Sequence, residues 1–158
     1  MDNNILLKFL ERNYYRGQIN GRLNVLKNYL QKQFFNSPQS QTSTEDSEWL
    51  KSLGEDFFKN FTTLNVYQVL SKLEKDIKLL QTLTIYVPFE MPDGEKDKLG
   101  LWLRGNFKKD LIFEIKLDPA LIGGTALSWK GIYRDYSLRA KIDQNHEAIL
   151  SSLKTLST

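Results

Sequence analysis

Few side chains in this sequence have the types and spacing that catalysis would need. His146 is the single histidine among 158 residues, and there is no cysteine. A metal site draws on several such ligands, and a Ser-His-Asp arrangement needs a histidine beside a nucleophile, so neither has local support. The missing cysteines also exclude a disulfide framework and a thiol nucleophile. We therefore expect His146 to be a packed or partly exposed helix residue, with no metal site and no cofactor.

Carboxylates are the next candidates for chemistry, as a general acid and base. Asp110, Glu114, Asp118 and Asp135 are dispersed along the second half of the chain. Glu114 falls on the outward side of an expected strand, where carboxylates are usually solvated. Because no spacing pairs two of these groups, the sequence predicts a protein that is not an enzyme.

The pair Gly123-Gly124 could suggest a loop that binds phosphate. A P-loop requires a downstream Gly-Lys-Ser/Thr, and the dinucleotide fingerprint requires three glycines that open a helix. Neither pattern is present, and an expected strand follows the pair. We interpret the glycines as a structural turn or bulge that uses positive φ angles.

The first half of the chain is expected to be helical. Residues 3 to about 35 have apolar positions at helical spacing, weakened by Gly17 and Gly21, which predicts one long helix or two helices meeting there. Residues 36–43 are polar, contain a proline and lack an apolar side chain, which predicts a loop.

Two further helices are expected before residue 81. Thr44 or Asp46 can cap a helix that runs to about Phe61, and Asn65 can cap the next one. The second of these has a clear amphipathic pattern. Residues 1–80 are therefore expected to form an antiparallel bundle of three or four helices. The expected apolar face of the last helix consists of Val66, Val69, Leu70, Leu73, Ile77 and Leu80.

Strands and helices alternate in the second half. Residues 83–87 are rich in β-branched and aromatic side chains and precede a proline, which is typical of a strand. Asp93 can cap a helix over about 94–107. Residues 111–117 alternate as a half-buried strand does. The side chains expected to point inward there are Leu111, Phe113, Ile115 and Leu117.

A hairpin and a last helix complete the expected order. Residues 125–129 and 132–136 are short strands, and Lys130-Gly131 between them suits a two-residue turn. A final helix is expected over 137–156. Residues 81–158 are thus predicted to be a small β-α-β-β-β-α domain, and the whole chain to be α+β. The expected buried face of the final helix holds Ile142, His146, Ile149, Leu153 and Leu156.

Composition limits the possible partners. The content of 41% hydrophobic and 12% aromatic residues supports a folded core. A net charge of +3 without a basic stripe argues against nucleic acid as a partner, since the densest basic spots, Lys108-Lys109 and 139–141, have acids nearby. Neither a membrane-spanning run nor a signal-type start is expected, so we predict a cytoplasmic protein.

Two sequence blocks carry a resemblance to a known family. Residues 118–124 read Asp-Pro-Ala-Leu-Ile-Gly-Gly, and residues 135–142 read Asp-Tyr-Ser-Leu-Arg-Ala-Lys-Ile. The run from Leu83 to Leu153 resembles the C-terminal domain of the delta subunit of F-type ATP synthases, called the oligomycin-sensitivity-conferring protein in mitochondria. Ala140 departs from the family's glycine. The matching positions are Asp118, Pro119, Leu121, Ile122, Gly123, Gly124, Asp135, Ser137, Arg139 and Lys141.

The resemblance implies a non-catalytic subunit of the peripheral stalk. The family's helical bundle, usually of six helices and thus longer than the one expected here, binds N-terminal segments of the alpha subunits. Its C-terminal domain binds the end of the membrane-anchored b subunit, so that the head does not turn with the rotor during proton-driven ATP synthesis. The resemblance thus places the chain peripherally, on the inner face of an energy-converting membrane. Trp129, Arg139, Lys141 and Leu150 are candidate partner contacts.

A second hypothesis stays open. The chain could be an adaptor that shares only the C-terminal fold and whose helices have a different partner. Genes for the b and alpha subunits on either side of this gene would favour the stalk subunit, whereas an isolated gene would favour the adaptor.

Overall fold

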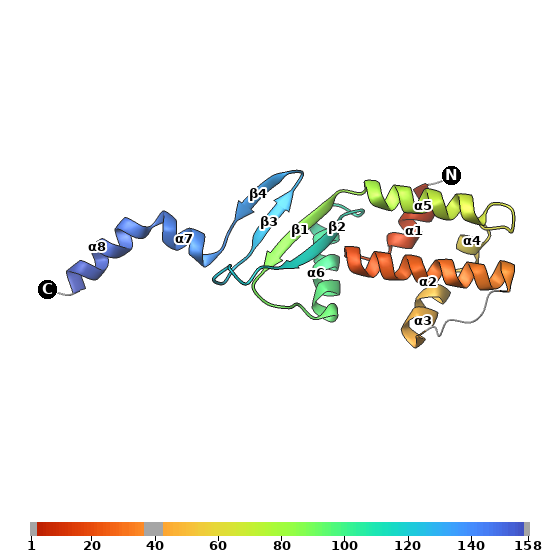
Figure 1. Cartoon of the computed structure of the whole chain (residues 1–158), viewed down its shortest axis with the longest axis horizontal. Helices are drawn as coiled ribbons and strands as arrows, with labels where there is room; N and C mark the ends of the chain where they lie inside the picture. Colours follow the sequence, from red (N-terminus) through yellow and green to blue (C-terminus); the bar gives the residue numbers. More distant parts are fainter. Residues whose placement is uncertain (1–2, 37–42, 157–158) are drawn as a thin grey trace.

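A computed structural model describes residues 3–36 and 43–156, with side-chain surroundings as far as residue 152. A helical part is followed by a four-stranded mixed sheet, and two further helices project from the end of the sheet (Figure 1). The expected α+β fold class is confirmed. The elements are α1 (Asn3–Leu10), α2 (Arg16–Phe35), α3 (Thr44–Leu53), α4 (Glu55–Phe58), α5 (Val66–Leu79), β1 (Thr82–Val87), α6 (Asp93–Asn106), β2 (Ile112–Leu117), β3 (Ala126–Trp129), β4 (Ile132–Asp135), α7 (Leu138–Gln144) and α8 (His146–Leu156).

The first helical stretch is interrupted at residues 11–15, and both Gly17 and Gly21 lie inside α2. The expected meeting point was therefore wrong. Tyr15 has extended backbone angles and forms a parallel bridge with Phe113 at the edge of the sheet. This pairing takes the chain out of the helical conformation before the glycines are reached.

The next expected helix is also divided. Ser43, and neither Thr44 nor Asp46, is its cap, because the Ser43 hydroxyl accepts a hydrogen bond from the backbone N–H of Asp46. Gly54 then has φ +78°, which ends α3, and the single turn of α4 ends at Phe58, earlier than expected. The break at 11–15 and the break at Gly54 thus divide the helical part into five helices within the described residues. Most of the expected polar loop lies outside those residues.

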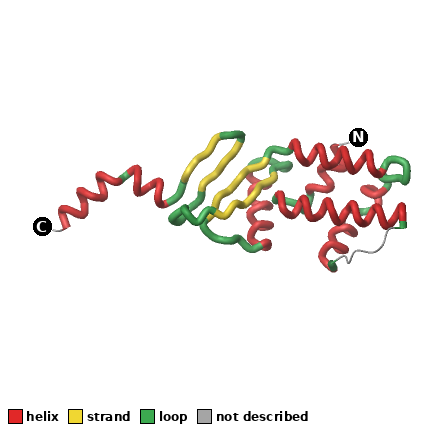
Figure 2. Tube along the Cα trace, viewed as in Figure 1, coloured by secondary structure: helices red, strands yellow, loops and turns green. Residues whose placement is uncertain are grey.

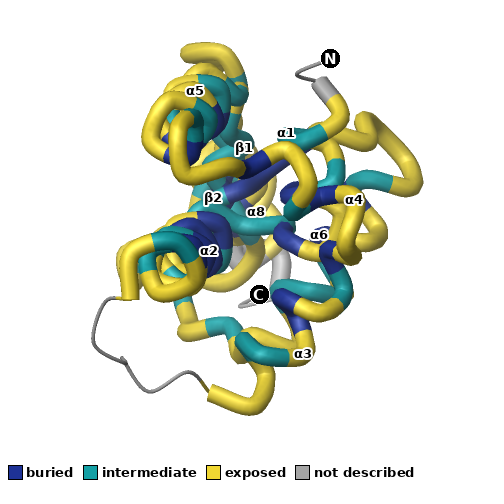
Figure 3. Tube along the Cα trace, turned by 90° about the vertical axis from the view of Figure 1, so that its right-hand side faces the viewer, coloured by how far each residue is buried: buried dark blue, intermediate teal, exposed yellow. Residues whose placement is uncertain are grey.

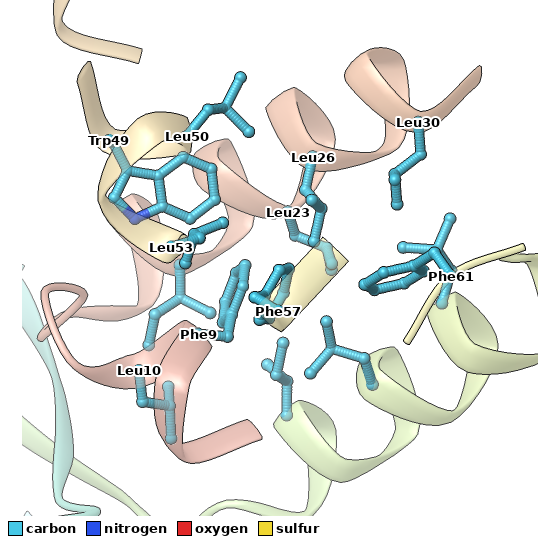
Figure 4. Packing of buried hydrophobic residues seen from close by; sticks show 14 of the residues in the cluster. Phe9, Leu10, Leu23, Leu26, Leu30, Trp49, Leu50, Leu53, Phe57 and Phe61 are labelled. Carbon is cyan, nitrogen blue, oxygen red and sulfur yellow. The ribbon is translucent and has the colours of Figure 1, made fainter. Parts of the chain in front are cut away.

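Apolar side chains from α1 to α5 share one core (Figure 4). The rings of Phe9 and Trp49 meet edge to face with centroids 5.7 Å apart. Asn65 precedes α5 as expected, although its side chain makes no cap bond and accepts from the N–H of Thr62 instead. Figure 3 shows buried and exposed stretches on the same helix for α2 and α5, as amphipathic helices require.

Four strands lie side by side in one sheet, drawn in yellow in Figure 2. Their order is β2-β1-β3-β4, with β1 parallel to β2 and antiparallel to β3. Helix α6 forms the crossover between the two parallel strands, as such a pair needs. Lys130 and Gly131 have φ angles of +52° and +79° and form the tight turn between β3 and β4. This is the two-residue hairpin expected from the sequence.

Strand β2 differs from the expected simple alternation. Leu111 and Phe113 are buried as expected, but Ile112 is fully buried on the opposite side, where it joins the helical core. Leu117 was expected to point inward and is exposed. The start of β2 lies between the two hydrophobic clusters, whereas Leu117 at its end belongs to neither of them.

Arg104 on α6 joins the sheet part to the helical part. Its guanidinium donates hydrogen bonds to the backbone carbonyls of Leu10, Asn13 and Leu111. It also lies 4.7 Å from the ring centroid of Tyr14. One partly buried cation therefore fixes the end of α1, the connection to α2 and the start of β2 against one another.

A close helix contact reinforces this junction. A Cβ placed on Gly100 would overlap the side chain of Tyr14, with the Cγ only 2.5 Å away, so α6 packs there without room for a side chain. Arg16 adds hydrogen bonds to the carbonyl of Ile77 at 3.0 Å and to the hydroxyl of Thr82 at 2.6 Å. The two hydrophobic clusters are thus connected by specific contacts rather than by chain alone.

The final helix differs most from expectation. It consists of two helices separated at Asn145, and the described side chains of α7 include no buried residue. Ile142 and Ile149 are each 40% exposed, and His146 is exposed as well, so the expected buried face was wrong for these three. The side chains of Leu153 and Leu156 lie outside the described range. We call residues 138–156 the C-terminal arm.

Candidate interaction surfaces

The two sequence blocks that carry the family resemblance meet in space. The carbonyl of Gly123 accepts a hydrogen bond from the N–H of Leu138 at 3.1 Å, and the N–H of Tyr136 donates to Thr125 at 2.9 Å. Gly123 and Gly124 have φ of +67° and +78°, and a Cβ on Gly124 would lie 2.7 Å from the carbonyl oxygen of Tyr136. The glycines therefore allow a close backbone junction, which fits the structural turn expected for them.

A tight turn leads into these glycines. The carboxylate of Asp118 accepts from the N–H of Ala120 at 3.0 Å, and its backbone carbonyl accepts from Leu121 at 3.2 Å. Pro119 suits the second position of such a turn because its φ is fixed. Leu121 is buried below the turn, whereas Ile122 is exposed. The block thus has one anchoring side chain and one that faces solvent.

Ser137 starts the C-terminal arm. It is fully buried, its hydroxyl accepts from the N–H of Ala140 at 3.2 Å, and its own N–H donates to the carboxylate of Asp135 at 2.8 Å. Hydrogen bonds from the side chain and then the backbone of Ser137 hold the pKa of Asp135 below its usual value, and Arg139 adds a smaller effect. This cap fixes the direction in which the arm leaves the sheet.

The four candidate partner contacts fall on two surfaces. Arg139 and Lys141 are exposed on α7, and Leu150 on α8 is 43% exposed. Trp129 lies on β3, partly buried, with the Nζ of Lys130 5.9 Å from its ring centroid. Three candidates therefore belong to the arm and one to the sheet.

An apolar groove of about 830 Å³ lies between α6 and the sheet. Leu83 and Ile85 of β1 and Leu127 of β3 form part of its lining. Trp102 of α6 and Phe107, which follows that helix, contribute exposed rings whose centroids are 5.7 Å apart. In Figure 1, α6 lies beside β1 and β2, whereas β3 and β4 extend beyond it. The groove exists because one helix does not cover a sheet of four strands.

A smaller groove lies between α1 and α5. Ile5 and Leu6 of α1 face Val69 and Leu73 of α5 across it, with Asp76 at its border. The side chains of Ile5, Leu6 and Val69 are only partly buried against the helical core. The groove is small, about 50 Å³, and Lys72 also lines it, so its walls are apolar with charge at the border.

Neither a cluster of metal ligands nor a membrane-spanning helix occurs in the described residues. Over 3–36 and 43–156, no three His, Cys, Asp or Glu side chains gather as metal ligands would. Glu114 lies 3.7 Å from the Nζ of Lys116 on the outer face of the sheet. Within the same residues, none of the helices combines the length and apolar composition needed to cross a bilayer.

A polar cluster at the start of α6, formed by Asp93, Lys96 and Tyr15, was not predicted from the sequence. Pro92 takes the cap position expected for Asp93, and Asp93 bonds to Lys96 at 2.8 Å. Lys96, and then Tyr15, lower the pKa of Asp93, while burial, followed by Asp93, raises the pKa of Tyr15 to about 12. Tyr14-Tyr15, two strand-favouring residues between helical patterns, was the available signal for the pairing with β2.

Comparison with known proteins gives a partial likeness. The chain is 28% identical over 91 residues to a protein named ATP synthase subunit delta from Rickettsia bellii (strain OSU 85-389). The match covers 55% of this chain and 44% of that protein, so the chain matches less than half the length of this curated relative. No family model matches the chain. The chain is therefore similar to a delta subunit over about half of its own length.

Proposed function

We propose that this protein is a non-catalytic peripheral-stalk subunit of an F-type ATP synthase. It would join the alpha subunits of the catalytic head to the membrane-anchored b subunit and resist the torque of the rotor. The observation that carries this proposal is the hydrogen-bonded junction between Gly123-Gly124 and 136–138. Both sequence blocks typical of delta subunits take part in it, and the likeness to a delta subunit points the same way.

A subunit that resists torque has to transmit force between its two ends. The contacts of Arg104 with the carbonyls of Leu10 and Asn13, and the tight packing of Gly100 on Tyr14, favour this role. They hold the helical part and the sheet part in a fixed arrangement, so a load applied to one part reaches the other without a hinge.

The helical part would bind the alpha subunit. An amphipathic segment could lie across α1 and α5 and place one apolar side chain in the groove formed by Ile5, Leu6, Val69 and Leu73. Such binding typically depends on a few apolar anchors at helical spacing. A charge introduced at Val69, which is only partly buried, should therefore abolish this binding.

The b subunit would bind at the opposite end. Exposed Leu150 supplies an apolar contact on α8, and Arg139 and Lys141 supply positive charge on α7. Trp129 would extend this surface onto the sheet. A b-subunit helix with acidic residues flanking an apolar stripe has the matching chemistry.

Co-purification tests the proposal. The tagged chain should recover the alpha and b subunits, and an alpha N-terminal peptide should bind the isolated protein. Val69→Glu should lose the peptide, whereas Leu79→Glu, at an exposed position on the same helix, should keep it. Leu150→Asp should abolish recovery of the b subunit while the alpha subunit is still recovered. Recovery of neither subunit would refute the proposal, and recovery of b without alpha would favour the adaptor hypothesis.

A further inference from the structure

The groove between α6 and the sheet has the size and lining of a small-molecule site. Its volume of about 830 Å³ lies within the roughly 300–1,000 Å³ that ligand pockets typically have. Leu83, Ile85 and Val87 alternate along β1, so their side chains line the same face of the strand, and Leu103 lines the groove from α6. Ile85, Val87 and Leu103 are buried in one hydrophobic cluster. The groove therefore has a floor of packed apolar side chains.

The charged side chains in the lining are two lysines at the same end of the groove. Thr84 of β1 pairs with Ser128 of β3, so Lys130, two residues further along, lies toward the Leu83 end of β1. Lys108 joins Lys130 in the wall of an adjoining cavity at the end of α5. Within residues 3–36 and 43–156, neither ammonium is part of an ion pair. One end of the apolar groove thus holds two cations that no carboxylate in those residues neutralises by direct contact.

The rest of the lining offers few hydrogen bonds. Asn106 and Thr125 also line the groove, but the Thr125 hydroxyl already donates to the carbonyl of Tyr86 at 2.8 Å. Strand β1 lies between β2 and β3, so both of its edges are paired and an extended peptide cannot add to it. Figure 1 shows the C-terminal arm leading away from α6 and the sheet. The site therefore suits an occupant without unpaired backbone groups, such as a hydrocarbon chain.

We propose that the groove between α6 and the sheet binds a free fatty acid, with its hydrocarbon chain along β1 and its carboxylate at Lys108 and Lys130. The hydrocarbon chain is uncharged, so nothing in the ligand cancels the attraction between its carboxylate and the two ammonium groups. Asp110 lines the adjoining cavity and not the groove. This site goes beyond the proposed stalk role. Trp129, suggested above as a contact of the b subunit, also lines the groove, so a bound fatty acid would compete with b for that residue.

Calorimetric titration of the full-length chain with saturated fatty acids of about 8 to 16 carbons, each below its micelle concentration, tests the proposal. Each CH₂ group that enters the groove should tighten binding about three- to fourfold, until the chain fills the groove. We expect dissociation constants of about 1–100 µM at that plateau. No binding of the chain with about 12 carbons at about 1 mM overturns the proposal. So does affinity that rises without a plateau, which indicates partition into an aggregate.

Two neighbouring residues of α6 give a matched pair of variants. Trp102 lines the groove and is 57% exposed, whereas Leu101 is 59% exposed and does not line it. Trp102→Glu places a charge in the apolar wall and should weaken binding at least about tenfold. Leu101→Glu should keep the wild-type affinity, and circular dichroism verifies that both variants are folded. Equal losses of affinity in the two variants would place the ligand elsewhere and overturn the proposal.

The position of the carboxylate has its own test. Lys108→Gln combined with Lys130→Asn should weaken binding of the fatty acid about tenfold and leave binding of the alcohol with the same chain length unchanged. Asparagine suits position 130 because φ there is +52°. Lys109→Gln, beside the groove lining, is the control. Equal effects on acid and alcohol, or no effect on either, overturn the assignment. No ATP synthase subunit takes part, so these results leave the proposed function to its own test.

Discussion

Gly124 lets the chain pass close behind the start of the arm, and a side chain at that position would disturb two backbones. Gly124→Ala should lower the free energy of unfolding by about 2–3 kcal/mol, because positive φ and the short approach to the Tyr136 carbonyl both oppose a Cβ. Gly123→Ala is the control: its φ is also positive, but the nearest atom is 3.9 Å away, so about 1 kcal/mol is expected. Urea denaturation measures both. Equal effects would contradict the close approach as the cause.

Tyr15 gives the protein a pH dependence at the alkaline end. Burial and Asp93 raise its pKa from 10.0 to about 12, so folding favours the neutral phenol. The stability that this provides is complete below pH 10 and is lost as the pH rises from there through 12. Tyr15→Phe should therefore lose less stability than the wild type over that interval in denaturation at a series of pH values. Tyr67→Phe, on the exposed surface of α5, should lose stability between pH 10 and 12 just as the wild type does. If Tyr67→Phe also flattened this pH dependence, the assignment to Tyr15 would be contradicted.

At the level of elements, the contact between α6 and the α1–α2 connection depends on one missing side chain. Gly100→Ala should destabilise the protein by about 2–4 kcal/mol, because the new Cβ overlaps the side chain of Tyr14. Gly105→Ala lies on the same helix with nothing within 4 Å, so the better helix propensity of alanine should leave stability unchanged or raise it by up to about 1 kcal/mol. Thermal denaturation of both variants compares them directly. A similar loss for both would mean that helix geometry, and not the contact, is responsible.

Sequence patterns predicted elements whose signals are local. The tight turn at Lys130-Gly131 and the strand that became β1 were confirmed, because turn chemistry and β-branched runs act over a few residues. The breaks at 11–15 and at Gly54, between α3 and α4, were missed because tertiary pairing decides the first and a positive φ the second. The buried face expected for the arm was wrong because periodicity shows that a helix is amphipathic without showing what covers it.

At the scale of the whole molecule, the contacts of Arg104 should make unfolding a single event. Trp49 reports on the helical core, and Trp102 and Trp129 report on the sheet part. We expect fluorescence and circular dichroism to follow one transition in urea. Arg104→Met should separate the two signals, because three carbonyls lose their shared donor. Two transitions in the wild type would contradict the coupling. The division into 1–80 and 81–158 stays a prediction, and this coupling argues against independent folding of the two pieces.

The bridge between Tyr15 and Phe113 also bears on how the protein is made. Arg104 joins carbonyls as far as 94 positions away, and the strand edge at Tyr15 likewise finds its partner only beyond α6. A chain emerging from the ribosome therefore exposes residues 11–15 long before their partners in α6 and β2 have been synthesised. Contacts of such separation form slowly and leave apolar surface uncovered meanwhile. The helical core can assemble early, whereas the sheet closes late in synthesis, and that interval is when the newborn chain is most open to aggregation or to a chaperone.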